Sequence, residues 1–126
     1  MSVNVDLDRL AETLADFPFA YLITVGDDFH AHTVAVDPVL RGGVFDVGNA
    51  GKTTRANLAQ HGDVTLLWPP RERGGYSLIV DGHALCPEEN VELVVVPRRA
   101  VLHRRATSDS PPQRPGCVDD CIPLES

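Results

Sequence analysis

Apolar residues along the chain recur with two different spacings, and the change of spacing marks the expected secondary structure. Near the start, Leu7, Leu10 and Leu14 fall on one face of a helix. Asp6 stands where a side chain caps the first turn, and Phe17-Pro18 ends the pattern. The sequence therefore predicts a short amphipathic helix at this end.

The remaining apolar segments have the lengths and the β-branched or aromatic content of strands. Six strands are expected, namely Phe19–Val25, Phe29–Val36, Val44–Val47, Val64–Trp68, Tyr76–Leu85 and Val91–His103. The turn signal Gly26-Asp27-Asp28 joins the first two as a hairpin. The second strand of that hairpin is partly apolar on both faces, as in a barrel wall with something on each side.

A second helix of about two turns is expected at Thr54–His61, with Gly62 at the position where a left-handed cap favours glycine. Pro97 implies an edge or a bulge in the last strand, and Asp81-Gly82 indicates a bulge or bend in the strand before it. From residue 106 onward the composition shifts to Thr, Ser, Asp, Pro, Gln and Gly, which is typical of an irregular tail.

These elements predict a mainly β fold (α+β) with two parts. Residues 1–105 are expected to form a six-stranded antiparallel split β-barrel with an N-terminal helix and a short crossover helix. Residues 106–126 are expected to form the irregular C-terminal tail. One hydrophobic core is the expectation for a chain of 126 residues.

Charge and composition exclude several classes of function. The formal net charge is −7 with 11 cationic side chains, which argues against a nucleic-acid-binding surface. No apolar segment approaches the ~20 residues of a membrane span, and residues 1–16 carry four acids where a signal peptide carries bases. A cytoplasmic protein without a nucleic-acid or membrane partner is therefore expected, and three cysteines argue against a disulfide framework.

The most informative segment joins a strand to the second helix and holds no acid between Asp46 and Asp63. It contains Gly48 and Gly51, followed by Lys52, Thr53, Thr54 and Arg55. Unpaired amides at a helix start, glycines, hydroxyls and cations together make an anion cradle, for which phosphate is the obvious occupant. The alternative is that a threonine merely caps the helix while the cations are solvated.

The order of these motifs resembles a known family. The segments Gly-Lys-Thr-Thr-Arg-Ala-Asn-Leu, Asp-Val-Thr-Leu-Leu-Trp and Gly-Gly-Tyr-Ser-Leu-Ile-Val-Asp-Gly are similar to those of small actinobacterial members of the pyridoxamine 5′-phosphate oxidase-like superfamily. These proteins are FMN-binding split β-barrels, and the resemblance covers about residues 17–105.

The resemblance implies a homodimeric flavoprotein, an oxidoreductase whose cofactor lies between two barrels. By position, Lys52, Thr53, Thr54 and Arg55 inherit the role of holding the cofactor phosphate. The strand segment His32-Thr33-Val34 matches the region that faces the flavin ring in relatives, and Trp68 is a further candidate for the groove. Flavin-binding relatives carry a basic residue at the position of Thr54, so FMN, F420 or no cofactor all remain open.

Several candidate residues have structural interpretations as well. His30 and His32 are either half-exposed strand histidines, a pair beside a flavin, or two metal ligands, although no third ligand is evident nearby. Trp68 is either a core residue or a ring-stacking one. Cys117 and Cys121 are either incidental, a thiol switch or metal ligands. No metal site and no catalytic side chain can be assigned.

Two functions fit these observations. One is a flavin-type or F420-dependent oxidoreductase, in which the cofactor performs the chemistry on an unknown small-molecule substrate. The other is a non-catalytic binding protein for flavin, F420 or haem, or a cofactor-free dimeric barrel, on the same fold.

Overall fold

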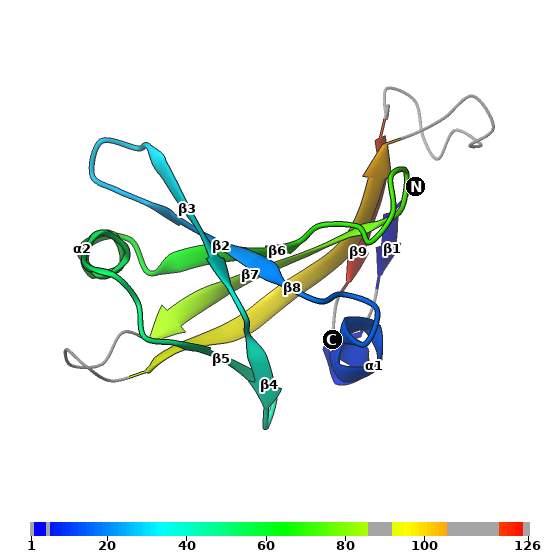
Figure 1. Cartoon of the computed structure of the whole chain (residues 1–126), viewed down its shortest axis with the longest axis horizontal. Helices are drawn as coiled ribbons and strands as arrows, with labels where there is room; N and C mark the ends of the chain where they lie inside the picture. The colour runs from blue at the N-terminus through cyan, green and yellow to red at the C-terminus, as the bar shows by residue number, and fades with distance from the viewer. Residues whose placement is uncertain (1, 5, 86–91, 106–118, 125–126) are drawn as a thin grey trace.

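The computed structural model describes residues 2–4, 6–85, 92–105 and 119–124 of the chain. They form a curled, mostly antiparallel sheet with short helices near its two ends (Figure 1). The strands are β1 Ser2–Asn4, β2 Ala20–Val25, β3 Ala31–Val36, β4 Val39–Arg41, β5 Val44–Gly48, β6 Asp63–Trp68, β7 Ser77–Leu85, β8 Leu93–Arg105 and β9 Asp119–Leu124. The helical segments are the 3-10 turn η1 Leu7–Arg9, α1 Leu10–Leu14 and α2 Lys52–Gln60.

The sheet order explains why the barrel is split. Its main path is β1-β9-β8-β7-β6-β2-β3, and β5 pairs with both β4 and β8. The long strand β8 therefore has Leu93–Val95 beside β5 and Ala100–Arg105 beside β9, and its residues Val101–His103 pair with β1 as well. Within the part of the chain that the structure describes, β3 pairs only with β2, so the sheet stays open between β3 and the β4–β5 hairpin.

The core lies on the concave face of this sheet. Alternate residues of β2, β6 and β7 are buried, as the period-2 pattern predicts. Trp68 is 2% exposed and its ring lies 5.3 Å from that of Phe45, in a tilted pair. Leu10 of α1 and Leu58 of α2 are buried in the same cluster, so both helices are fixed to the core.

The expected fold class is confirmed, since all six predicted strands are present within a mainly antiparallel sheet. The structure adds the short strands β1, β4 and β9. Of the predicted irregular tail 106–126, residues 119–124 form β9, which corrects the expectation for that segment. Its register places Asp119 and Asp120 opposite Arg105 and Arg104.

The irregularity expected at Pro97 and at Asp81-Gly82 is one and the same bulge. Asp81 pairs with Arg99 and Gly82 with Pro97, which leaves Arg98 as the extra residue on β8. Pro97 also lies between the two partners on the other side of β8, where no ladder bond requires its missing N–H. Both predictions are confirmed.

Two predicted helix caps are wrong. Asp6 makes no side-chain cap bond and only its carbonyl accepts from the amide of Arg9. Gly62 is absent from the left-handed residues, because α2 ends in the extended residue His61. Its lack of a side chain has another cause: a Cβ on Gly62 would lie 2.5 Å from the ring of His83.

Cys117 and Cys86 lie outside the described residues, and Cys121 falls on β9. No helix among the described residues is long and apolar enough to cross a membrane.

Candidate functional site

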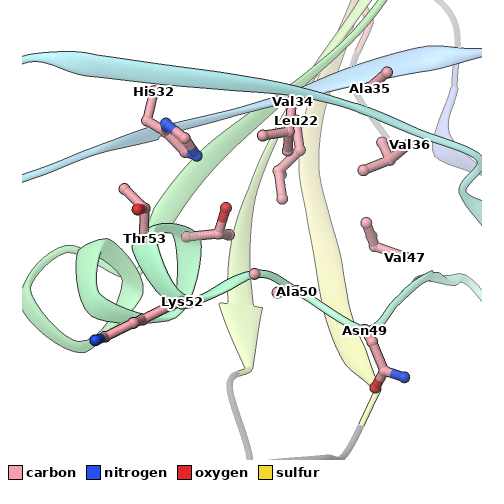
Figure 2. Close-up of a pocket in the computed structure, with 12 residues that line it drawn as sticks. Leu22, His32, Val34, Ala35, Val36, Val47, Asn49, Ala50, Lys52 and Thr53 are labelled. Atoms are coloured by element: carbon pink, nitrogen blue, oxygen red, sulfur yellow. The ribbon is translucent and has the colours of Figure 1, made fainter.

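A pocket of about 360 Å³ occupies the opening of the split barrel. One wall is β3, and the other is the end of β5 with the segment that leads into α2 (Figure 2). Ligands of small-molecule size bind in concave sites that are mostly apolar with a few polar groups. The pocket here combines apolar side chains such as Val34 and Val47 with a polar end at Lys52 and Thr53.

The apolar lining comes from strands on both sides of the opening. Because side chains alternate along a strand, His32, Val34 and Val36 of β3 face the pocket together. Val47 and Ala50 lie opposite them, as Figure 2 shows. The predicted site residues His32 and Val34 thus line the pocket.

Thr33 lies on the other face of β3. It is exposed and is not among the lining side chains, so it does not share the site with His32 and Val34. His30 precedes β3 and its imidazole pairs with the carboxylate of Asp28 at 3.1 Å. The backbone N–H of His30 also donates to Asp28 and lowers the pKa of that carboxyl. The two histidines therefore do not act as a pair.

The start of α2 forms the polar end of the pocket. The helix begins at Lys52, two residues before the predicted start, and Gly51 at its N-cap offers no side-chain bond to the first amides. No acid lies in the first turn. Thr53 and Thr54 both border the pocket, but Thr54 is only 1% exposed, whereas Thr53 is exposed and its side chain points toward the space under His32 (Figure 2). Helix amides, hydroxyls and a positive dipole end are thereby presented to one cavity.

The two cations of this segment differ in position. Lys52 borders the pocket, but its ammonium group extends away from His32 and the valines in Figure 2. Arg55 is not a lining residue, and its Nε donates to the carbonyl oxygen of Ala50 at 3.2 Å. Arg55 thus braces the loop from within, and Lys52 is the cation at the rim.

Asn57 is a structural part of the site that the sequence analysis did not single out. Its side-chain amide donates to the hydroxyl of Thr24 on β2 at 3.1 Å, and Thr24 is only 1% exposed. This bond ties α2 to the sheet beside the pocket. The signal in the sequence is an asparagine in a helix interior, where its low propensity calls for a tertiary reason.

The acid nearest to this loop in the sequence is held by a hydrogen-bonded pair. The Asp46 carboxylate accepts from the amide of Gly48 at 3.0 Å. Its pKa is lowered first by a hydrogen bond from the Glu92 carboxyl and then by that amide. The pKa of Glu92 is raised by the same hydrogen bond and by the negative charge of Asp46. Arg41 lies 3.9 Å from Asp46 as well.

Trp68 does not belong to the pocket. It is buried against Phe45 in the core and is not a lining residue, which confirms its interpretation as a core residue and corrects its assignment to the groove. Its position at the end of an uninterrupted apolar strand was the signal for this role.

No family model matches the sequence. Two mycobacterial proteins, Uncharacterized protein Mb0449c of Mycobacterium bovis and Uncharacterized protein MT0457 of Mycobacterium tuberculosis, are each 52% identical to it over 133 residues. The alignment covers 94% of this chain and 94% of each relative. The chain belongs to their family.

Solved structures match the fold of this family member at low sequence identity. A Listeria innocua protein named for pyridoxamine 5′-phosphate oxidase has a TM-score of 0.62 at 16% identity, covering 76% of this chain and 96% of that one. The FAD binding protein from Mycobacterium smegmatis scores 0.60 at 16% identity, covering 84% and 100%. A heme binding protein from the same species scores 0.57 at 15% identity, covering 95% and 59%.

An F420 reductase also matches, with a TM-score of 0.51 at 16% identity and coverage of 75% and 93%. The fold is therefore the split barrel of pyridoxamine 5′-phosphate oxidase-like proteins, as the resemblance of the motifs implied.

Proposed function

We propose that this protein binds a phosphorylated flavin-type cofactor, FMN, in the pocket between β3 and α2 and serves as an oxidoreductase. The observation that carries the proposal is the start of α2, which opens into the pocket with Thr53 and Thr54 and without any acid in its first turn. The names of the fold neighbours, which include FAD, F420 and haem proteins, support a ligand of this kind.

The residues present fit the cofactor. The phosphate would lie at the first turn of α2, where the Thr53 hydroxyl and the backbone amides donate and Lys52 adds charge at the rim. Thr54 lies buried beneath this turn. The flat ring would lie along β3, against His32 and Val34, where apolar side chains keep water away. A bound flavin supplies hydride or electron transfer, so the chain itself needs only to bind and orient it.

Comparison of FMN with riboflavin tests the phosphate contact directly, because the two ligands share the ring. Charge-assisted hydrogen bonds contribute roughly 1.5–3 kcal/mol each, so we expect FMN to bind at least tenfold more tightly in a calorimetric titration. Equal affinities would show that the helix start does not hold the phosphate. A protein whose melting temperature is unmoved by FMN and by F420 would contradict the cofactor proposal as a whole.

A substitution at Thr53 distinguishes an electrostatic effect on phosphate binding from an effect on the stability of the fold. Thr53→Asp places a carboxylate in the first turn of α2, which stabilises the helix but repels a phosphate. We expect this variant to lose the tenfold preference for FMN while its affinity for riboflavin and its melting temperature are kept. Thr53→Asn is the neutral control of similar size, and an equal loss in both variants would refute the electrostatic explanation.

A non-catalytic carrier is the second candidate. It is favoured by Thr54, which stands where flavin-binding relatives carry a cation. Reduction of the bound flavin by a nicotinamide donor, followed by reoxidation with turnover, distinguishes the enzyme from the carrier. A flavin that is bound but does not turn over with any donor would favour the carrier.

We also propose that the protein is a homodimer, on the evidence of the convex face of the sheet. The strand register places one apolar row across four strands of that face: Ala35, Tyr21, Leu67 and Ile79. An antiparallel sheet with one solvated face carries polar residues there, whereas this row is apolar from end to end. The row therefore indicates a covered surface.

A second copy of the chain is the occupant that the charges favour. Beside the apolar row lie Asp63 and Asp81 together with Arg98 and Arg99, and Arg98 is 3.8 Å from Asp63. Both signs occur on one patch, as a two-fold contact between identical surfaces requires. We expect light scattering to give the mass of a dimer at micromolar concentration.

Leu67→Asp tests this face. It places a charge on the centre of the row, and we expect a monomer with an unchanged circular dichroism spectrum. Val39→Asp is the matched control, since Val39 is an exposed valine of β4 outside the row. A monomeric wild-type protein, or a dimer that survives Leu67→Asp, would contradict the proposed interface.

A further inference from the structure

A second cavity, of about 630 Å³, lies away from α2, near α1. Figure 1 shows these two helices at different ends of the sheet. The cavity is bordered by the end of α1, by the connection between β6 and β7, and by Leu102 of β8. Its size falls within the ~300–1,000 Å³ typical of small-molecule sites. The cofactor pocket and this cavity have no lining residue in common.

The walls of the second cavity are set by contacts within the chain. In the β6–β7 connection, the amide of Gly75 donates to the carbonyl oxygen of Glu72 at 3.0 Å, and Gly74 adopts a φ of 85° that favours glycine. The guanidinium of Arg104 lies over the ring of Tyr76, 4.7 Å from its centroid, and fixes that aromatic wall. These contacts hold the turn at Gly75 and the ring of Tyr76 in place, whereas the charged lining residues Asp16, Arg71 and Glu72 are exposed.

Apolar and aromatic side chains form the body of the cavity. Phe17 and Tyr76 supply two rings, and Pro70 and Leu102 supply further apolar surface. Aromatic ligands gain both buried area and ring packing in such surroundings. A ligand with an aromatic ring is the kind that these walls favour.

Three charged side chains border the same cavity without partners. Asp16 and Glu72 are carboxylates and Arg71 is a guanidinium. Among the described residues, none of the three makes an ion pair or a side-chain hydrogen bond, and Arg71 does not pair with either acid. By contrast, Asp28, Asp46 and Asp63 each have a basic neighbour. Charges of both signs therefore stand apart around one apolar cavity.

We propose that this cavity binds a small aromatic zwitterion, a molecule with one ring, one ammonium group and one carboxylate. The ring packs against Phe17 and Tyr76, the ammonium group faces Asp16 and Glu72, and the carboxylate faces Arg71. Two carboxylates with aromatic rings suit an organic cation, and a single guanidinium suits one carboxylate. The proposal stands apart from the cofactor pocket and does not depend on it.

L-Phenylalanine is the probe, and two analogues that each lack one charge are the comparison. Phenethylamine lacks the carboxylate, and 3-phenylpropionate lacks the ammonium group. In titrations of the full chain followed by amide chemical shifts, we expect L-phenylalanine to bind about tenfold more tightly than either analogue. The shifts should occur at Phe17 and Tyr76 and not at Thr53 or Thr54.

Charge-neutral variants test each contact separately. Arg71→Gln should weaken L-phenylalanine and 3-phenylpropionate and leave phenethylamine unchanged, while Asp16→Asn should weaken L-phenylalanine and phenethylamine. Arg73→Gln and Asp8→Asn are matched controls, because these exposed residues do not border the cavity and should change nothing.

Three outcomes would overturn the proposal. One is an absence of binding for all three probes at millimolar concentration, and another is equal affinity for all three. The third is an equal effect of the cavity variants and their controls. The amide chemical shifts of α2 are observed separately from those of Phe17 and Tyr76. If no probe binds this cavity, the proposal of a flavin in the other pocket therefore still stands.

Discussion

Removal of the Asn57 side chain should weaken both the fold and the cofactor pocket. Asn57→Ala deletes the amide that donates to the Thr24 hydroxyl at 3.1 Å. Thr24 is 1% exposed, so water cannot replace the lost donor. A buried polar group left without a partner costs about 1–3 kcal/mol, and we expect the free energy of unfolding to fall by that amount.

A double-mutant cycle isolates the hydrogen bond from other effects of truncation. Thr24→Val removes the acceptor while keeping the shape of the side chain, so no polar group is left unsatisfied in the combined variant. We expect the two changes together to cost less than the sum of the single changes, with a coupling of about 0.5–3 kcal/mol. Urea unfolding followed by circular dichroism measures all four proteins.

The same variants report on the site, because this bond fixes α2 against β2 next to the pocket. We expect Asn57→Ala to weaken FMN more than riboflavin, since a displaced helix start misplaces the donors to the phosphate. Additive effects on stability would refute the assignment of this hydrogen bond. If Asn57→Ala lowers the free energy of unfolding as expected but keeps the wild-type preference for FMN over riboflavin, the hydrogen bond to Thr24 does not support the pocket.

Three further predictions concern the sheet and its charges. Gly82→Ala should lower the free energy of unfolding by roughly 1–3 kcal/mol, because a Cβ there would lie 2.6 Å from the carbonyl oxygen of Val96. Gly51→Ala meets no atom within 4 Å and loses only the preference of the α2 N-cap for glycine, so it should cost less by urea unfolding. Trp68→Ala should cost about 3–5 kcal/mol in the same measurement, and a smaller loss would contradict its place in the core. The raised pKa of Glu92 stabilises the fold below its ordinary value of 4.5, and this contribution is lost as the pH rises through the raised value. The lowered pKa of Asp46 stabilises the fold above its ordinary value of 3.8, and that contribution is lost only as the pH falls through the lowered value. Glu92→Gln keeps a donor that does not titrate, so its melting temperature should lack the fall on raising the pH that the wild type shows, and parallel profiles would contradict this.

The strands followed from the sequence because each carries its own signal. Alternation or an uninterrupted apolar segment located β2, β3, β6, β7 and most of β8. Of the strands that were missed, β1 and β4 have only three residues each, whereas β9 is as long as β2 but lacks a clear strand pattern. β1 and β9 lie beside the far end of β8, and the pairing of Asp119 and Asp120 with arginines is visible only once the register is known.

The sequence predicted which segments form the pocket, but it did not predict the contacts that the longer side chains make there. The acid-free entry to α2 and the alternation of β3 placed Thr53, Thr54, His32 and Val34 on one pocket. The sequence could not show that Arg55 turns back to the carbonyl of Ala50, because a side chain as long as arginine reaches several partners from one position. It also could not show Asn57 meeting Thr24, since the two are 33 residues apart.

The register of β1 has a consequence for biosynthesis. Ser2, Val3 and Asn4 pair with His103, Leu102 and Val101, so the two ends of the barrel wall meet across almost the whole length of the described chain. This pairing cannot form until residue 103 has left the ribosome, and contacts between such distant positions slow folding through the entropy of closing a long loop. The first strand to be synthesised is therefore among the last to join the sheet, and until β1 and β9 have both joined, this part of β8 remains an open edge on which a nascent chain can meet its neighbours.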